Sequence, residues 1–230
     1  MSRRRRKKRP ETTDNSRLGY KENRLKARTE GQREFIYKIK DHTVTLCSGP
    51  PGSGKTHIAI ALGVQALKNG LVNRLLLTRP AVEASMSLGF LPGDLMQKLS
   101  PFLVPLMDEL SYYMDAKLVS KLIEEKIIEI CPVGFFRGRT LKNTYVIVDE
   151  AQNCVLYELR TLLTRLGEGS KMILVGDTRQ SDIDNSGFRT LMRMMEGIED
   201  LAIHKFTYED VVRHPLVVRI EERFEDAASS

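Results

Sequence analysis

The sequence contains no tryptophan, few cysteines and no long uninterrupted apolar run. No apolar segment approaches the ~20 residues that cross a bilayer, so we expect no membrane association. The N-terminus is basic, but no apolar stretch follows it, and we therefore expect no secretory signal. The lack of tryptophan predicts an aliphatic core that is completed by phenylalanine, tyrosine and methionine.

The three cysteines, Cys47, Cys131 and Cys154, are isolated from one another along the chain. They form no CxxC pair and no cysteine–histidine spacing that is typical of zinc sites. An odd number of cysteines with apolar neighbours is typical of buried, reduced thiols in a reducing compartment. We therefore expect a cytoplasmic protein.

The positive charge of the chain is concentrated at its N-terminus. The net charge is +6, yet Arg3 to Arg9 form an unbroken basic run and the remainder is near neutral. Such a run is disordered because its charges repel one another and it offers no apolar side chains. We predict a flexible basic arm over residues 1–28 and one folded domain over residues 29–230. The arm either contacts the phosphates of nucleic acid or acts as a solubilising tail.

Apolar segments with strand and helix periodicity alternate along the rest of the chain. Strands are predicted at residues 43–47, 74–78, 127–131, 144–148, 171–175 and 203–206. Helices are predicted at residues 29–39, 55–68, 94–114, 118–125, 156–165, 187–195 and 217–224. We expect Pro101 and Pro105 to kink or break the third helix, and residues 88–94 to form a loop. This alternation predicts an α/β three-layer sandwich with a mostly parallel central sheet.

A glycine-rich segment lies between the first strand and the helix that follows it. It reads Gly49-Pro50-Pro51-Gly52-Ser53-Gly54-Lys55-Thr56. This matches the Walker A pattern G-x-x-x-x-G-K-[ST] in full and in the required context. Glycines let backbone N–H groups approach phosphates, and the helix N-terminus adds its positive end. The segment predicts a P-loop NTPase fold of the RecA-like type and an ATP site.

Side chains at the end of this segment have separate predicted roles. Lys55 neutralises the β- and γ-phosphates, and Thr56 supplies a hydroxyl to Mg²⁺. His57 follows directly and completes the set of residues that we expect at the nucleotide, although its ring is better suited to packing than to catalysis.

An acidic pair follows the strong β-formers at residues 144–148. Asp149, at the strand end, is predicted to hold Mg²⁺ in the manner of a Walker B carboxylate. Glu150 projects differently and can polarise the attacking water, which favours hydrolysis over simple nucleotide binding.

A polar turn also follows the apolar strand at residues 171–175. Gln180 lies in this turn, where a side chain can sense the γ-phosphate. Arg79 and Arg165 end two predicted elements and are further candidates for phosphate contact. Because the carboxyl ends of parallel strands meet at one edge of a sheet, these candidates are expected to converge.

Several segments together resemble one known family. Asp149-Glu150-Ala151-Gln152 and Gly176-Asp177-x-x-Gln180 resemble motifs II and III of superfamily-one helicases. Further matching segments are residues 79–84, 88–95, 137–141, 149–153, 163–167 and 210–214. Over residues 29–224 the sequence resembles the PhoH family, the phosphate-starvation-inducible ATPases that bacteriophages also carry.

The resemblance implies an ATPase with a helicase-like core that uses ATP and Mg²⁺. It implies RNA or single-stranded nucleic acid as the partner, and a ring-like homo-oligomer, a hexamer. Gln32 would read the adenine base, and Arg213 would reach a neighbour's nucleotide as a finger that contributes ~10³–10⁵ in rate. A structural ion pair is the alternative role of Arg213. After Ala84 the family usually has Gly-Glu, whereas this sequence has Ser85-Met86.

A single helicase-like lobe has to borrow the second wall of its ATP cleft from a neighbour, which is why helicase-type cycling would require oligomerisation. Phe90, Phe135 and Phe136 lie near Arg137 and Arg139, and they either stack on bases or pack in the core. Two other functions are alternatives. A nucleoside kinase of the thymidine kinase type usually carries paired cysteines near its C-terminus, which this sequence lacks. An ATP-switched assembly protein would not need Glu150.

Overall fold

The computed structural model describes residues 19–80, 95–136 and 138–213, together with positions 216, 217, 219, 220 and 223. Its centre is a six-stranded sheet with the order β3-β2-β4-β5-β1-β6. All pairings between these strands are parallel. The strands are β1 (Val44–Ser48), β2 (Arg74–Thr78), β3 (Ile128–Ile130), β4 (Thr144–Val148), β5 (Lys171–Gly176) and β6 (Leu201–Lys205).

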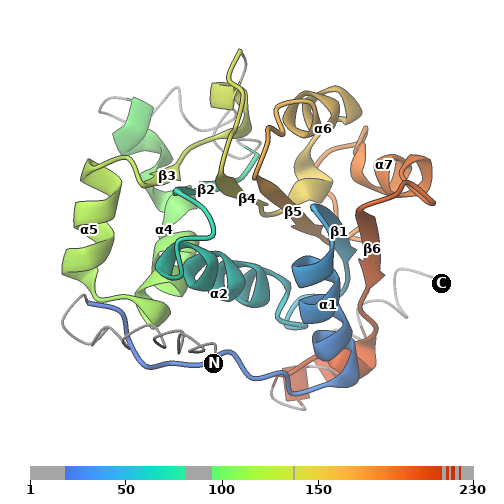
Figure 1. Cartoon of the computed structure of the whole chain (residues 1–230). Coiled ribbons are helices and arrows are strands. Elements are labelled where there is room, and N and C mark those ends of the chain that lie inside the picture. Colours follow the sequence, from blue (N-terminus) through green and yellow to red (C-terminus); the bar gives the residue numbers. More distant parts are fainter. Residues whose placement is uncertain are drawn as a thin grey trace, which may run out of the picture.

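Helices cover both faces of the sheet, as Figure 1 shows. One face carries α1 (Glu30–Asp41), α2 (Lys55–Lys68), α4 (Leu95–Tyr113) and α5 (Ala116–Glu124). The other carries α6 (Leu156–Leu163), α7 (Phe188–Met194) and the 3₁₀ turns η2 (Val133–Phe136) and η3 (Ala151–Asn153). A further 3₁₀ turn, η4 (Tyr208–Asp210), follows β6. The predicted three-layer sandwich is thereby confirmed.

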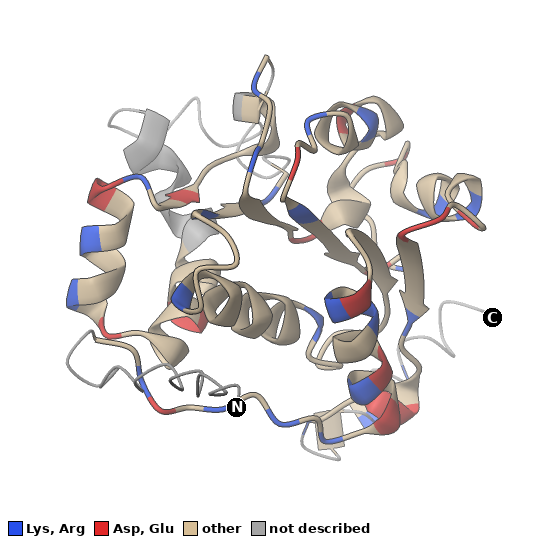
Figure 2. Ribbon diagram, in the orientation of Figure 1, with Lys and Arg blue, Asp and Glu red and all other residues tan. Residues whose placement is uncertain are grey.

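The central strands are apolar throughout because both of their faces are buried. Along β4, Tyr145 and Ile147 pack under α2, whereas Val146 and Val148 face α6 and α7. Helix α2 is correspondingly rich in apolar residues between its two terminal lysines, and Figure 2 shows almost no charge along it. This helix therefore fixes the P-loop at its N-terminus rigidly against the middle of the sheet.

Helix α1 begins where the predicted domain begins. Thr29 is its N-cap and accepts a hydrogen bond from the backbone N–H of Gln32 at 3.1 Å. Phe35 and Ile39, four residues apart, are buried on one side of the helix. Lys171 donates to main-chain oxygens at the other end of α1, including that of His42 at 2.6 Å. Such a cation stabilises the last carbonyls of a helix.

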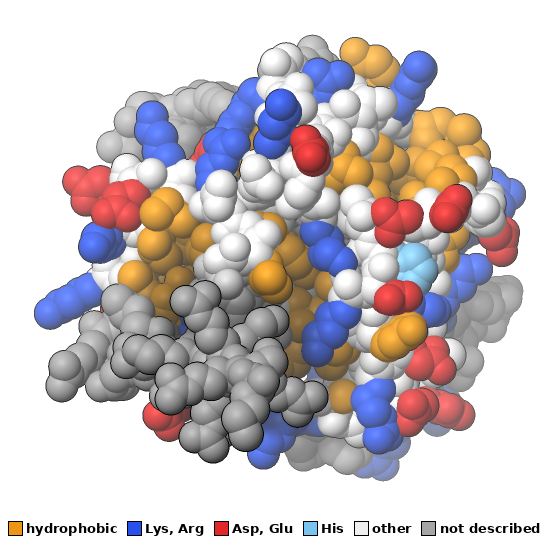
Figure 3. All heavy atoms as spheres, viewed as in Figure 1, with side chains coloured by type: hydrophobic (Ala, Val, Ile, Leu, Met, Phe, Trp, Pro, Cys, Tyr) orange, Lys and Arg blue, Asp and Glu red, His pale blue; other side chains and the backbone are white. Residues whose placement is uncertain are grey.

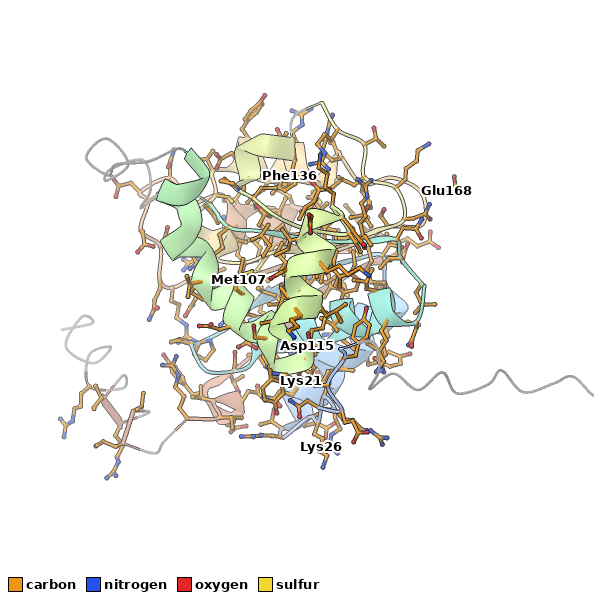
Figure 4. The ribbon with its side chains drawn as sticks, turned by 90° about the vertical axis from the view of Figure 1, so that its left-hand side faces the viewer. Lys21, Lys26, Met107, Asp115, Phe136 and Glu168 are labelled. Carbon is orange, nitrogen blue, oxygen red and sulfur yellow. The ribbon has the colours of Figure 1, made fainter. Side chains whose placement is uncertain are left out.

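Residues 19–28, which we assigned to the N-terminal arm, run past the ends of α4 and α5. The backbone N–H of Lys21 donates to Tyr113 at 2.8 Å, and Asp115 donates to Gly19 at 2.8 Å. Figure 4 shows Lys21 and Asp115 on this side of the molecule. The described part of the arm is thus hydrogen-bonded to the domain. Residues 1–18 lie outside the described residues, and the boundary at residue 28 stays a prediction.

Most predicted elements lie within two residues of the observed ones. Of the kink or break predicted at Pro101 and Pro105, the break is wrong, because α4 is one helix from Leu95 to Tyr113, and the kink stays a prediction. The predicted loop at residues 88–94 lies outside the described residues. Positions 217, 219, 220 and 223 of the predicted last helix are helical, as is position 216 before it.

No helix in the described ranges is both long and apolar enough to cross a membrane.

Candidate nucleotide site

The P-loop joins the carboxyl end of β1 to α2. Gly52 and Gly54 both have a φ of +85°, a left-handed conformation that favours glycine. The backbone N–H of Ile58 donates to Gly54 at 2.9 Å, and the N–H groups before it lie in the first turn, where helices offer no internal partner. The loop therefore presents backbone donors and the positive end of α2 at one place, which suits a phosphate group.

Lys55 lies folded over this loop. Its Nζ donates to the main-chain oxygens of Gly49 at 2.7 Å and Pro50 at 2.9 Å. Burial lowers the pKa of Lys55, and the nearby Asp177 and Glu150 are among the groups that oppose this shift. The ammonium of Lys55 is largely withdrawn from water and is bonded only to neutral carbonyls. A charge-assisted hydrogen bond to a phosphate would therefore stabilise it more strongly than these carbonyls do.

Thr56 connects the P-loop to the acidic pair after β4. Its hydroxyl donates to Oδ1 of Asp149 at 2.6 Å, and only 2% of Asp149 is exposed. A hydroxyl and a carboxylate are the hard oxygen ligands that Mg²⁺ prefers, so these residues fit the ion. Within the described ranges no group of three or more His, Cys, Asp or Glu side chains converges as a metal site. A Mg²⁺ ion held here would take its remaining ligands from phosphates and water.

Arg79, at the end of β2, occupies the other oxygen of this carboxylate. Its Nε donates to Oδ2 of Asp149 at 2.7 Å, and its Nη2 donates to the same atom. Nη2 also lies 3.9 Å from Oε1 of Glu150. The sequence marked Arg79 only as a candidate for phosphate contact, whereas the structure places its guanidinium between the two carboxylates.

Glu150 has a φ of +54°, which is unusual for a residue with a side chain. Its carboxylate is about half exposed, at 47%, and accepts a hydrogen bond from Nε2 of Gln152 at 2.6 Å. Oε1 of Gln152 accepts from the backbone N–H of Asp177 at 2.9 Å. Gln152 therefore connects the ends of β4 and β5 and orients the predicted general base. The sequence had shown this glutamine only as part of a motif.

Comparison with known proteins now identifies the family. The family model "PhoH-like protein" matches residues 24–225. The chain belongs to the PhoH family. A PhoH-like protein of Synechocystis is 50% identical over 204 residues, which cover 87% of this chain and 62% of the relative. A PhoH-like protein of Bacillus subtilis is 46% identical, covering 87% and 64%. Protein PhoH of Escherichia coli is 36% identical, covering 84% and 56%. The chain thus spans under two thirds of the length of these curated relatives.

Solved structures share the fold at low sequence identity. The large terminase of a thermophilic bacteriophage has a TM-score of 0.52 and 12% identity, and the match covers 86% of this chain and 49% of the terminase. A crystal form of the same terminase in complex with ADP has a TM-score of 0.50. These matches confirm the P-loop NTPase fold that the Walker A pattern predicted.

The remaining residues that the PhoH resemblance implied lie around the P-loop. Gln32 is buried on α1, donating from Nε2 to the main-chain oxygen of Ser53 at 3.0 Å and accepting from the N–H of Arg28 at 2.8 Å. It braces the P-loop, and its reading of adenine stays a prediction. Arg213 is exposed and lies against Gly52, where a Cβ would come 2.5 Å from its Nε. Arg213 therefore contacts its own P-loop, and its action on a neighbour stays a prediction.

His57 and Gln180 differ in how closely they approach the loop. The ring of His57 is directed to α4, where Nδ1 bonds to Glu109 at 2.8 Å and Nε2 to the hydroxyl of Tyr113 at 2.9 Å. Both ring nitrogens are used within the chain, so we assign the ring to packing. Gln180 lies exposed after β5, where its N–H donates to Asp177 at 3.2 Å. Its γ-phosphate role stays a prediction.

Two groups of candidate residues are not brought to this site. Arg165 lies at the amino end of β4, where its main-chain oxygen accepts from Leu141 at 2.8 Å, so the phosphate role weighed for it is wrong. Phe136, labelled in Figure 4, is fully buried in the core, and Arg139 holds Glu129 through two hydrogen bonds of 2.8 and 2.9 Å. Phe90 and Arg137 lie outside the described residues, as does the side chain of Phe135.

Proposed function

We propose that this PhoH-family chain binds Mg-ATP at its P-loop and hydrolyses it. The observation that carries the proposal is the 2.6 Å hydrogen bond between Thr56 and Asp149. It brings the Walker A hydroxyl and the Walker B carboxylate, which are 93 positions apart in the sequence, to one point beside Lys55. An ordinary glycine turn before a helix would not be expected to place a hydroxyl against a buried carboxylate from a distant part of the chain.

The residues around this point would have separate roles in binding the phosphates, holding Mg²⁺ and activating water. The P-loop N–H groups and Lys55 would hold the β- and γ-phosphates, and Thr56 and Asp149 would hold Mg²⁺. When bound, the ion neutralises phosphate charge and polarises the terminal phosphoryl group. Glu150 would orient the attacking water and accept its proton, because its carboxylate is accessible and is held in place by Gln152.

We further propose that hydrolysis is coupled to the remodelling of RNA or single-stranded nucleic acid by a homo-oligomer, a hexameric ring in the cytoplasm. The basic run at residues 3–9 and the helicase-like motifs support the nucleic-acid partner. The face shown in Figure 3 offers less support for a nucleic-acid partner, because acidic and basic side chains are interspersed around α1 and form no continuous basic surface in the described part. A neighbouring subunit would supply the second wall that a single lobe lacks.

The test is phosphate release from ATP on size-resolved protein, with and without single-stranded RNA or DNA. Replacement of the seven basic residues 3–9 by serine separates the two parts of the proposal. We expect basal turnover to remain, and polymer stimulation and its salt dependence to fall. If neither RNA nor DNA changes the rate of ATP turnover by the unmodified protein, the proposed coupling of hydrolysis to nucleic acid is contradicted. ADP with a phosphorylated nucleoside would indicate a kinase, and no product would indicate an assembly switch.

A further inference from the structure

Both oxygens of the predicted metal ligand are occupied within the chain. Oδ1 of Asp149 accepts from the Thr56 hydroxyl at 2.6 Å, and Oδ2 accepts from Nε of Arg79 at 2.7 Å. The side chain of Asp149 is 3% exposed and that of Arg79 is 21% exposed. A cation at Oδ2 would compete with the guanidinium, because two positive groups would share one buried carboxylate.

A buried ion pair resists the removal of one partner, because the charge that remains is left unpaired in a poor solvent environment. Arg79 can leave Asp149 only if each of the two charges finds a replacement. Asp149 would gain the cation, and Arg79 would need an anion within reach of its present position. Glu150 is one, but its Oε1 is 3.9 Å from Nη2, and the carboxylate is held where it is by the hydrogen bond that Oε2 accepts from Gln152.

We propose that Arg79 is a γ-phosphate sensor that acts within its own subunit. It holds Asp149 in the nucleotide-free chain and exchanges this carboxylate for the terminal phosphate of Mg-ATP. With Mg-ATP both charges keep a partner, whereas with Mg-ADP the guanidinium loses Asp149 and gains no γ-phosphate. The exchange would make the site prefer ATP to ADP. This inference rests on the proposed nucleotide site, but it does not require hydrolysis or a nucleic-acid partner.

The position and chemistry of Arg79 suit this role. It follows β2, the neighbour of β4 in the sheet, at the edge where Asp149 and Glu150 lie. A guanidinium offers several donors in a planar fork, which matches phosphate as well as carboxylate. Lys55 lies in the field of the same two carboxylates, so the P-loop lysine and Arg79 belong to one charge cluster.

The other end of β2 offers a matched control. Arg74 pairs with Glu129 at 3.4 Å, with side-chain exposures of 37% and 22%. This pair lies at the amino end of the strand, away from the P-loop, and has no path to a nucleotide. Arg74→Ala removes an arginine at the opposite end of β2 that also contacts a carboxylate, while Glu129 keeps its two hydrogen bonds from Arg139.

The experiment measures the affinity of Mg-ADP and of a hydrolysis-resistant Mg-ATP analogue by calorimetry. We expect Arg79→Ala to weaken the ATP analogue roughly tenfold or more, since a charge-assisted contact to phosphate is lost. Mg-ADP should bind as well as before or better, at a lower half-saturating Mg²⁺ concentration, because nothing competes for Asp149. Arg79→Lys should recover only part of the preference, and Arg74→Ala should keep all of it.

Three outcomes would overturn the sensor. These are an equal loss of both affinities in Arg79→Ala, an unchanged preference for the ATP analogue, or a higher Mg²⁺ requirement with ADP. Thermal melting shows whether Arg79→Ala is folded, and Arg79→Lys retains the charge if it is not. If the unmodified protein binds neither nucleotide, the proposed function itself fails. If it binds and hydrolyses ATP while Arg79→Ala keeps its preference, the sensor alone fails.

Discussion

Buried polar groups behave differently at the carboxyl edge of the sheet and in its interior. At the edge, Asp149, Gln152 and Asp177 bond to other groups that surround the P-loop. Other buried polar atoms are isolated: the hydroxyls of Tyr145 within β4 and Thr78 at the end of β2, and Nε2 of His204 in β6, have no hydrogen-bond partner. A satisfied buried network holds side chains in fixed positions, whereas an isolated buried polar atom only lowers stability. The connected groups around the P-loop are therefore placed for a ligand, and the isolated groups are expected to affect folding alone.

The largest effect on nucleotide binding is expected at the edge, from Lys55→Ala. Its Nζ now holds only main-chain oxygens and would move to the phosphates, so its loss should weaken ATP binding on the order of a hundredfold. Calorimetric titration with a hydrolysis-resistant ATP analogue measures this. Gln65→Ala, an exposed position on the same helix, is the control and should bind as the unmodified protein does. Equal affinity in both variants would exclude the P-loop as the nucleotide site.

A smaller effect is expected from Gln152→Leu, which removes the connection between Glu150 and Asp177. Because the carboxylate of Glu150 loses its 2.6 Å hydrogen bond, kcat should fall about tenfold while the affinity for ATP changes little. Steady-state phosphate release gives kcat and KM separately. Gln65→Leu serves as the matched glutamine control. A rise in KM at constant kcat would place Gln152 in nucleotide binding rather than in orientation of the base.

In the interior, His204 should make stability depend on pH. Burial lowers its pKa from 6.5 to about 4, with the charge of Lys38 as a second cause. Between these values the unfolded chain binds a proton that the folded chain does not, so stability falls as the pH falls from about 6.5 to about 4. His204→Phe should remove up to about 1.4 kcal/mol per pH unit of this slope. Urea unfolding at several pH values tests it, and equal slopes in both proteins would contradict the assignment.

The smallest effect has the opposite sign. Tyr145→Phe removes a buried hydroxyl that has no partner, so the free energy of unfolding should rise by about 1 kcal/mol. Tyr113→Phe is the matched control, because its hydroxyl bonds to Nε2 of His57 at 2.9 Å, and its loss should lower stability. Denaturant unfolding of both variants measures whether each substitution raises or lowers the free energy of unfolding. A loss of stability in Tyr145→Phe would show that its hydroxyl is satisfied in solution.

The sequence predicted the parts of the site that are local in the chain. The P-loop, the acidic pair and the strands before them follow from patterns within ten residues, and the structure brings Lys55, Thr56, Asp149 and Glu150 together. The contact of Arg79 with Asp149 could not be predicted, because it depends on β2 and β4 being neighbours in the sheet. Arg165 lies at the opposite edge because it follows α6, which returns from the carboxyl end of β4 to the start of the parallel strand β5.

Burial was the second limit of sequence reasoning. Phe136 belongs to the core through packing against residues that are distant in the sequence, so a pattern of aromatic and basic residues could not distinguish stacking from packing. Helix α4 likewise continues through two prolines because its tertiary packing, with Leu106 and Leu110 buried, outweighs the local preference.

Single-turnover phosphate release by Glu150→Gln, beside the unmodified protein, tests the central claim most directly. The account predicts that the variant binds Mg-ATP with nearly unchanged affinity and releases phosphate about 10²–10⁴-fold more slowly, since the general base is lost and the binding groups remain. Phosphate release at the unmodified rate would show that Glu150 is not the base and that the Walker B pair does not perform the proposed hydrolysis.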